Sequence, residues 1–245
     1  MDVENPLPDF LGDHLRELRR RVVVFFVSVL CFTALAYYFS RPIAAYLIQP
    51  ILAASPEVEG LIYTGLTEAF VGYLKVAVLV GVAASFPVGC YELWMFVAPG
   101  LRGREKNVAL TVSFWATFLF VAGIIFAYFV ALPEILTFLM NTAGPQLQAK
   151  PRLDSYLTFT ARTVFAFGLA FEIPFLMVAA GRTSLVSRRY FIDKRWISYG
   201  AILILAFLLA AGDLFGAVLL ALPLIILYEI GVLLMVLFSP RSDPD

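Results

Sequence analysis

The sequence predicts an all-α polytopic membrane protein with six transmembrane helices, both termini in the cytoplasm, and short fifth and sixth helices. Of the 245 residues, 61% are hydrophobic and only 15% are charged, and the mean hydropathy is +0.88. A soluble domain carries about a quarter charged residues. The charges here cluster between long apolar runs. We therefore expect residues 1–245 to form a single transmembrane domain.

The apolar runs set the expected spans, and their lengths are unequal. The second and third runs exceed the roughly 20 residues needed to cross about 30 Å of hydrocarbon. The second must tilt, protrude or kink near Pro87, and the third carries Pro133 near its outer end. The fifth reaches only about 24 Å, and Gly212 and Asp213 tie it to the sixth by a tight return. The predicted spans are residues 22–39, 67–98, 108–140, 155–180, 196–211 and 214–238.

The distribution of basic residues orients these spans. Thirteen of the 18 Lys and Arg residues lie on one side of the predicted topology, three lie on the other, and Lys75 and Arg162 lie within spans. Short loops rich in Lys and Arg stay in the cytoplasm. The expected cytoplasmic loops are residues 99–107 and 181–195, and the expected outside loops are residues 40–66 and 141–154.

The first span and the segment after it need separate comment. Arginines before an apolar run, with Ala34-Leu35-Ala36 inside it, also fit a cleavable secretory signal. Five further spans follow, which such a signal does not explain, so a transmembrane helix is favoured. In the first outside loop, Ile43–Ile48 is apolar enough to form an interfacial helix.

Several chemistries are excluded by composition. His14 is the single histidine, which excludes two-histidine haem ligation and histidine zinc clusters. The phosphate-loop pattern GxxxxGK[ST] and the serine-elbow pattern GxSxG are both absent. Cys31 and Cys90 fall inside apolar runs and are expected to be buried thiols instead of a disulfide. We expect no catalytic residue, no metal and no cofactor, and hence no enzyme.

Two acids stand among the basic residues of the predicted cytoplasmic side. The loop Phe96–Lys106, FVAPGLRGREK, contains Pro99, which stops a helix, and Glu105 among three positive charges. The segment before the first span, HLRELRRR, contains Glu17. We predict that this loop and the segment His14–Arg21 form a docking surface for a positively charged peptide.

A simpler interpretation of the two acids is local pairing. Glu17 with Arg21 is an i,i+4 pair, and Arg102 with Glu105 is an i,i+3 pair, each worth a few tenths of a kcal/mol. Alternatively, the two carboxylates receive two guanidinium groups from a ligand, because a planar guanidinium matches a carboxylate in a bidentate manner.

Other charged residues lie inside the apolar runs. Glu172, in FEIPF, lies about 15 Å deep by helical rise from Arg182, and a carboxylate there must be paired, wet or neutral. It is either a polar contact for a partner helix, a protonatable group, or a neutral carboxyl buried in the bundle. Asp213 is either functional or a turn residue. Snorkelling of the polar end is expected for most of Lys75, Arg162, Glu68, Glu92, Glu134 and Glu229.

HLRELRRR, FVAPGLRGRE, FEIPF and the Asp213 hairpin together resemble the TatC family, from His14 to about Phe238. TatC is the substrate-receptor subunit of the twin-arginine protein translocase. The resemblance implies a multi-pass protein of the cell (plasma or inner) membrane that binds twin-arginine signal peptides of folded precursors and scaffolds a complex driven by the proton-motive force. The implied partners are TatA-type and TatB-type single-span subunits, further copies of the chain and the lipid bilayer, with no nucleic acid.

The resemblance also assigns roles to residues. It implies that Glu17 and Glu105 bind the arginine pair, and that Glu172 and Asp213 serve partner recruitment. Around the last turn the chain departs from the family, with Ala210, Ala211, Gly212 and Ala217 where polar residues and proline are frequent, which favours close packing on small residues. The remaining implied residues are Arg19, Phe96, Pro99 and Leu101 for signal-peptide binding and Pro50 for structure.

Two other functions are weighed against this one. Glu172 by itself suggests an ion-coupled small-molecule transporter, which would carry substrate without any partner subunit. An intramembrane enzyme is the weakest alternative, because no metal cluster, serine–histidine set or aspartate pair is visible.

Overall fold

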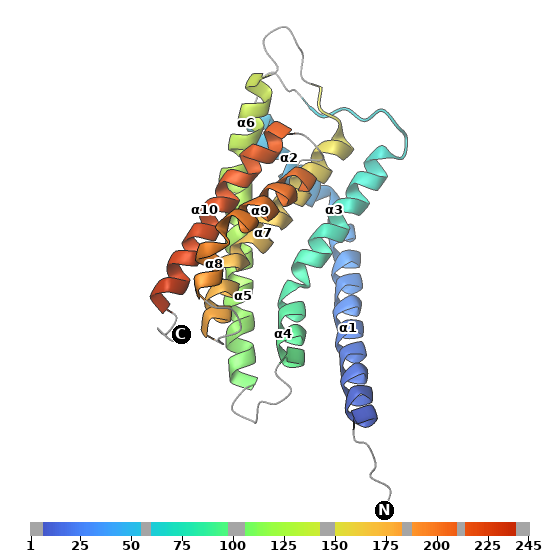
Figure 1. Ribbon diagram of the computed structural model, residues 1–245. Helices are drawn as coiled ribbons and strands as arrows, with labels where there is room; N and C mark the ends of the chain where they lie inside the picture. The colour runs from blue at the N-terminus through green and yellow to red at the C-terminus, as the bar shows by residue number, and fades with distance from the viewer. Residues whose placement is uncertain are drawn as a thin grey trace, which may run out of the picture. The chain divides into compact units, whose positions relative to one another are not determined.

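The computed structural model describes residues 7–54, 60–97, 106–142, 150–182, 188–209 and 214–238. The chain divides into two compact units. The first comprises Met1–Phe39 and Ala77–Thr117, and the second comprises Ser40–Val76 and Phe118–Asp245. Within the described ranges the regular elements are helices (Figure 1), apart from one isolated β-bridge.

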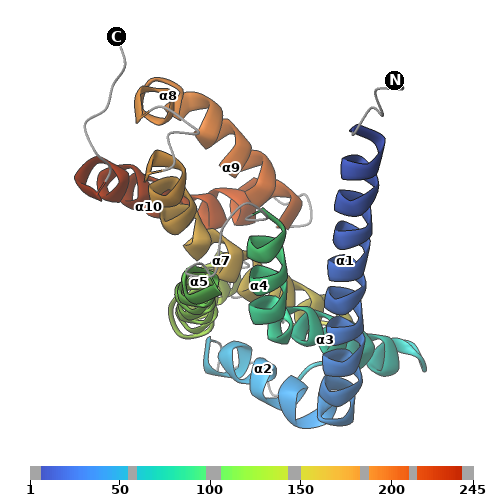
Figure 2. The same ribbon diagram turned by 90° about the horizontal axis from the view of Figure 1, so that it is seen from below.

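In the first unit, α1 (Leu7–Tyr38) runs beside α4 (Phe86–Val97) in the opposite direction. Both views show α4 along α1 (Figures 1 and 2). Glycines allow the close approach: a Cβ on Gly81 would lie 2.1 Å from Oγ1 of Thr33, and one on Gly89 would lie 2.8 Å from Cε2 of Phe25. A side chain at either position would therefore separate α1 from the helices packed against it.

The second predicted span is bent, which is one of the three alternatives that its length left open. It consists of α3 (Glu68–Ala84) and α4, which meet at an angle of 45°. Pro87 lacks an N–H and its ring crowds the carbonyl one turn earlier. At the break, the Ser85 hydroxyl donates to the Gly81 carbonyl at 2.7 Å. The predicted kink near Pro87 is confirmed.

The second unit is a helical bundle around α7. In it α10 packs along α7 and α9, and α2 packs against α6 and α7 (Figure 2). Its core includes Phe167, Leu220 and Leu224, all at most 2% exposed. Besides the amino-terminal part of α3 and the carboxy-terminal part of α5 (Lys106–Phe126), its helices are α2 (Ser40–Ala54), η1 (Ala127–Ala131), α6 (Leu132–Thr142), α7 (Leu153–Arg182), α8 (Arg188–Asp193), α9 (Arg195–Leu209) and α10 (Leu214–Phe238).

The third predicted span is one continuous run of α5, η1 and α6. Its π-helical turn Ala127–Ala131 precedes Pro133, which donates no N–H and displaces the carbonyl of Phe129 one turn back. The wider turn absorbs this displacement: the Leu132 N–H donates to the Ala127 carbonyl instead of to Tyr128.

A close crossing joins α5 to α7 within the second unit. A Cβ on Gly123 would lie 2.5 Å from the Phe167 carbonyl oxygen, and one on Gly168 would lie 2.7 Å from Cε2 of Phe120. The two helices therefore touch backbone to backbone, which is how small residues drive helix association inside a membrane.

Helix length and apolar composition indicate which helices can span a membrane. Four described helices are long and apolar enough, the bent pair α3–α4 makes a fifth, and α9 is a shorter apolar helix. With 15 residues, α9 reaches about 22 Å, so the short fifth helix is confirmed. The expectation of a short sixth helix is wrong: α10 has 25 residues, because its apolar run continues through Pro223 without a break.

The helix over the predicted segment Ile43–Ile48 is confirmed and is longer than expected. It is α2, and Pro50 lies buried inside it. Pro50 cannot donate to the carbonyl of Tyr46, four residues earlier. Tyr128 of η1 donates its hydroxyl to that carbonyl at 2.7 Å, and Tyr156 of α7 donates to the Leu47 carbonyl at 2.7 Å. Two tyrosines thus satisfy carbonyls in the turn that Pro50 disturbs.

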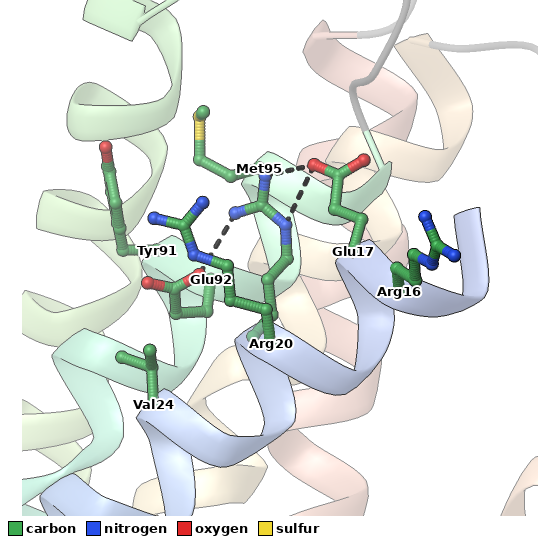
Figure 3. Close-up of a pocket in the computed structure, with 8 residues that line it drawn as sticks. Arg16, Glu17, Arg20, Val24, Tyr91, Glu92 and Met95 are labelled. Atoms are coloured by element: carbon green, nitrogen blue, oxygen red, sulfur yellow. Dashed lines mark hydrogen bonds and ion pairs between the residues drawn. The ribbon is translucent and has the colours of Figure 1, made fainter. Parts of the chain in front are cut away.

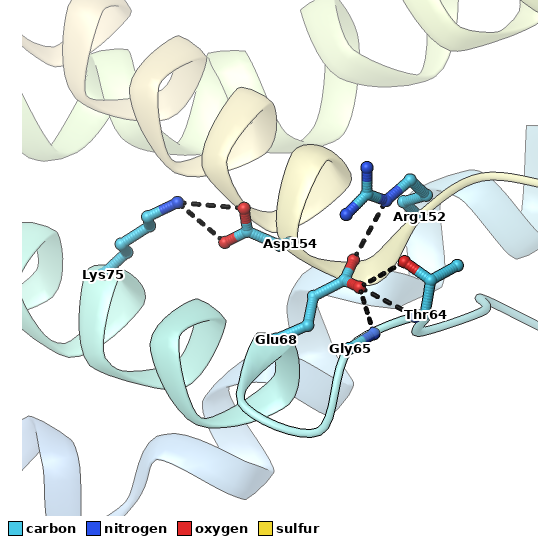
Figure 4. Close-up of polar contacts among 6 residues, drawn as sticks. All are labelled: Thr64, Gly65, Glu68, Lys75, Arg152 and Asp154. Carbon is cyan, nitrogen blue, oxygen red and sulfur yellow. Dashed lines mark hydrogen bonds and ion pairs between the residues drawn. The ribbon is translucent and has the colours of Figure 1, made fainter.

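Glu68 does not snorkel. Its carboxylate is buried and binds the segment just before α3 (Figure 4): Oε2 accepts from Thr64 N at 2.8 Å, Thr64 Oγ1 at 3.0 Å and Gly65 N at 3.2 Å. Oε1 accepts from Nε of Arg152 at 3.2 Å. A backbone bridge pairs Ile62 with the same arginine. The segment before α3 is thereby joined to the segment before α7.

Lys75 and Glu229 also have specific partners. Lys75 Nζ donates to both oxygens of Asp154 at 2.8 and 2.9 Å (Figure 4). Glu229 accepts from the Tyr199 hydroxyl through Oε1, and its Oε2 lies 3.2 Å from Nη1 of Arg195. Snorkelling is therefore the wrong account of these two residues, because their polar ends are satisfied by neighbouring helices.

Candidate functional site

The candidate site lies where the amino-terminal half of α1 meets α4, in the first unit. Arg21 of α1 is hydrogen-bonded to two carboxylates, and Figure 3 shows the dashed lines that end on these two acids, Glu17 and Glu92. Its Nε donates to Oε1 of Glu17 at 3.1 Å, and its Nη2 donates to the same oxygen. Its Nη1 donates to Oε2 of Glu92, on α4, at 3.0 Å. One guanidinium therefore bridges an acid on each helix.

Local sequence positions these groups. Glu17 and Arg21 are one helical turn apart and share a face of α1. Phe25, one turn further along, contacts Gly89 of α4. Glu92 is three residues beyond Gly89 and so points to the same side of α4. The Gly89 crossing holds the helices close enough for the Arg21–Glu92 ion pair.

A cavity of about 540 Å³ surrounds this ion-pair network. It combines three guanidinium groups with two carboxylates, a phenol and two apolar side chains. The Glu17 side chain remains 36% exposed, against 16% for Arg21 and 19% for Glu92. Glu17 is thus the carboxylate that an incoming cation reaches most easily. The lining residues are Arg16, Glu17, Arg20, Arg21, Val24, Tyr91, Glu92 and Met95.

The structure places three of the six residues expected to bind a signal peptide. Glu17 lines the cavity, and its predicted local pair with Arg21 is confirmed. Arg19 is exposed on α1 and does not line the cavity. Phe96 is half-buried on α4, one turn after Glu92. The other three, Pro99, Leu101 and Glu105, lie outside the described residues, as does the pair of Arg102 with Glu105.

Glu92 is the site residue that sequence reasoning missed. The sequence places it among six charged residues near span ends, most of which are expected to snorkel, yet it is bound to Arg21. One signal in the sequence points to it: Glu92 lies one helical turn before Phe96, the first residue of the motif FVAPGLRGRE. Its partner lies 71 positions away in the sequence, and no local pattern identifies a pair at that separation.

The residues predicted for partner recruitment belong to the second unit. Glu172 of α7 is buried, against the backbone of Phe120 in α5, and its Oε1 has no hydrogen-bond partner among the described residues. It lies one turn after Gly168, on the face where α5 and α7 cross. Asp213 lies outside the described residues. Ala217 of α10 is 3% exposed and belongs to the hydrophobic core of the second unit.

Known proteins resemble this chain in sequence and in fold. Residues 13–223 match the family model described as "Sec-independent protein translocase protein (TatC)". The TatC proteins of Desulforapulum autotrophicum and Aquifex aeolicus are each 36% identical over 233 residues, and these alignments cover 95% and 91% of this chain and 86% and 93% of the relatives.

Structural comparison agrees. A solved structure titled "Crystal Structure of Twin Arginine Translocase Receptor- TatC" superposes with a TM-score of 0.81 at 34% identity, covering 91% of this chain and 98% of that one. A second structure, of the same receptor in DDM, gives a TM-score of 0.77, also at 34% identity, covering 90% of this chain and 98% of that one. The predicted fold class, an all-α membrane protein with six transmembrane helices, is confirmed.

Proposed function

Since this chain belongs to the TatC family, and is a subunit of the Sec-independent protein translocase, we propose that it captures twin-arginine signal peptides at the α1–α4 cavity. The observation that carries this proposal is the guanidinium of Arg21 held between Glu17 and Glu92. The Glu17 carboxylate, which accepts two N–H groups of this guanidinium, has the geometry to accept a signal arginine in its place. The comparisons give no support to an ion-coupled small-molecule transporter.

Capture works through charge-assisted hydrogen bonds. Glu17, which lines the cavity, accepts one signal arginine, and Glu105, which follows α4 in the sequence, accepts the other. Each such bond contributes about 1.5–3 kcal/mol. A planar guanidinium donates two parallel N–H groups to a carboxylate, whereas a lysine ammonium is a single point charge, so a Lys-Lys signal is rejected by geometry. Arg19, Phe96, Pro99 and Leu101 shape the surroundings of the pair.

We further propose that the chain is a single transmembrane domain of the cell (plasma or inner) membrane, with both termini in the cytoplasm. The excess of Lys and Arg in alternate loops supports this orientation. It places Glu17 where a precursor still in the cytoplasm meets it. The protein acts as receptor and scaffold without covalent chemistry, and the proton-motive force drives transport.

Partner subunits bind the second unit in this proposal. TatA-type and TatB-type single-span helices contact Glu172, whose buried Oε1 has no partner among the described residues. A helix that donates a hydrogen bond to it removes the cost of an unsatisfied buried oxygen. Small residues around Asp213, including Ala217, allow close helix packing. Further copies of the chain join the same complex. Pro50 has a structural role within α2.

The test is peptide binding to the purified full-length protein in detergent or nanodiscs. A labelled twin-arginine signal peptide binds the wild type, and its Lys-Lys counterpart binds at least tenfold more weakly. Glu17→Gln and Glu105→Gln each weaken the twin-arginine peptide by roughly tenfold or more. Glu134→Gln, an exposed acid at the start of α6, leaves binding unchanged. Equal affinity of all variants for the peptide would contradict the proposal.

A further inference from the structure

Arg21 occupies the carboxylate that the proposed function assigns to the signal peptide. Its Nε and Nη2 both donate to Oε1 of Glu17. A signal arginine therefore competes with a guanidinium that belongs to the receptor itself. Arg21 is only 16% exposed. If it moved away from Glu17 and found no other acceptor, its charge would be unpaired and largely shielded from water, which is strongly unfavourable.

Glu92 supplies that other acceptor. Its Oε2 already accepts from Nη1 of Arg21 at 3.0 Å, and its side chain is 19% exposed, so the pair is shielded from water. A guanidinium has five N–H donors in a planar fork, and a carboxylate can accept two of them in parallel. A small rotation of Arg21 toward α4 therefore exchanges two bonds to Glu17 for a second bond to Glu92.

The charge balance of the cavity supports the same reading. Its lining holds three arginines, Arg16, Arg20 and Arg21, against two acids, Glu17 and Glu92. Arg21 and Glu92 form an ion pair within this lining, so removing both leaves the net charge of the cavity unchanged. The negative charge of Glu92 offsets the positive charge of Arg21, and the Glu92 side chain is less exposed than that of Glu17.

We propose that Glu92 is a positioning residue that takes over Arg21 and so releases Glu17 for a signal arginine. This inference rests on the proposed function. It predicts that Glu92 acts through Arg21 and does not itself touch the peptide. Direct binding of the signal arginine by Glu92 is the competing account, and the two differ in what happens when Arg21 is removed.

A double-mutant cycle separates these accounts. Binding of a labelled twin-arginine peptide is measured for the full-length wild type, Glu92→Gln, Arg21→Gln and the double variant. We expect Glu92→Gln to weaken binding by roughly threefold or more, and Arg21→Gln to bind at least as tightly as the wild type. In the Arg21→Gln background, Glu92→Gln changes the affinity by less than about twofold.

Either of two outcomes with Glu92→Gln overturns the inference. One is unchanged affinity of Glu92→Gln while Glu17→Gln is impaired. The other is an equal loss from Glu92→Gln with and without Arg21, which shows direct contact with the peptide. Failure of the wild type to prefer the twin-arginine over the Lys-Lys peptide defeats the proposed function itself. If Glu92→Gln does not fold, Glu92→Asp replaces it, because aspartate keeps the charge with a shorter reach. We expect Glu92→Asp to lose less peptide affinity than Glu92→Gln would, and to lose none in the Arg21→Gln background. A loss of affinity that persists in the Arg21→Gln background overturns the inference.

Discussion

The hydroxyl of Tyr128 donates a 2.7 Å hydrogen bond to the backbone carbonyl of Tyr46, and the two rings stack with centroids 5.0 Å apart. That carbonyl is the one that Pro50 leaves without an intrahelical donor. A proline inside α2 is thus matched by a tyrosine at the π-helical turn of the third span. The match explains how a proline-containing helix remains regular against the bundle.

Tyr128→Phe removes this hydrogen bond and should lower the free energy of unfolding by about 1 kcal/mol. The measurement is thermal or denaturant unfolding of the purified protein in detergent. In a Pro50→Ala background, residue 50 regains an N–H that can donate to Tyr46. The same Tyr128→Phe change should then cost clearly less, and an equal cost in both backgrounds would show that the tyrosine acts independently of the proline.

Gly123→Val should strongly destabilise the second unit. A Cβ at this position lies 2.5 Å from the Phe167 carbonyl oxygen, and backbone of a packed helix cannot move aside as a flexible side chain does. Overpacking of this kind costs about 1–3 kcal/mol or more. Gly200→Ala is the matched control, since nothing lies within 4 Å of its Cβ position; it should be neutral or stabilising. Similar unfolding midpoints for both variants would refute the close α5–α7 crossing.

The two acid–base pairs near the start of α7 should differ in importance. Glu68→Ala leaves the N–H groups of Thr64 and Gly65 and the guanidinium of Arg152 without their acceptor, and it should lower the unfolding temperature measurably. Lys75→Met breaks only the pair with Asp154, in which Lys75 is 43% exposed, and exposed pairs contribute little. A larger effect from Lys75→Met would reverse this ranking.

Salt should weaken twin-arginine peptide binding. The proposed contacts of Glu17 lie at a partly exposed rim, so they are screened as the Debye length falls from about 10 Å at 0.1 M to about 3 Å at 1 M. Affinity measured across this range should fall steadily, and the preference over a Lys-Lys peptide should persist because it depends on geometry. Salt-independent affinity would place the main contacts in the apolar part of the peptide.

Part of the site follows from local sequence. Glu17 and Arg21 are one helical turn apart, and that spacing alone predicts their ion pair. Glu92 does not follow, because its contact with Arg21 depends on where α4 crosses α1. The same is true of Glu68, Lys75 and Glu229: each sits near a span end, where snorkelling is the reasonable expectation, but each meets a partner on another segment.

The amino-acid sequence by itself determined the membrane class, the succession of spans, the break at Pro87 and the short fifth helix, because apolar run length and proline act locally. Only the tertiary structure decided which polar groups from distant segments meet: Glu92 with Arg21, and the Tyr128 hydroxyl with the Tyr46 carbonyl. These contacts depend on where glycines such as Gly89 let two helices approach, and that distance is set by packing across the chain.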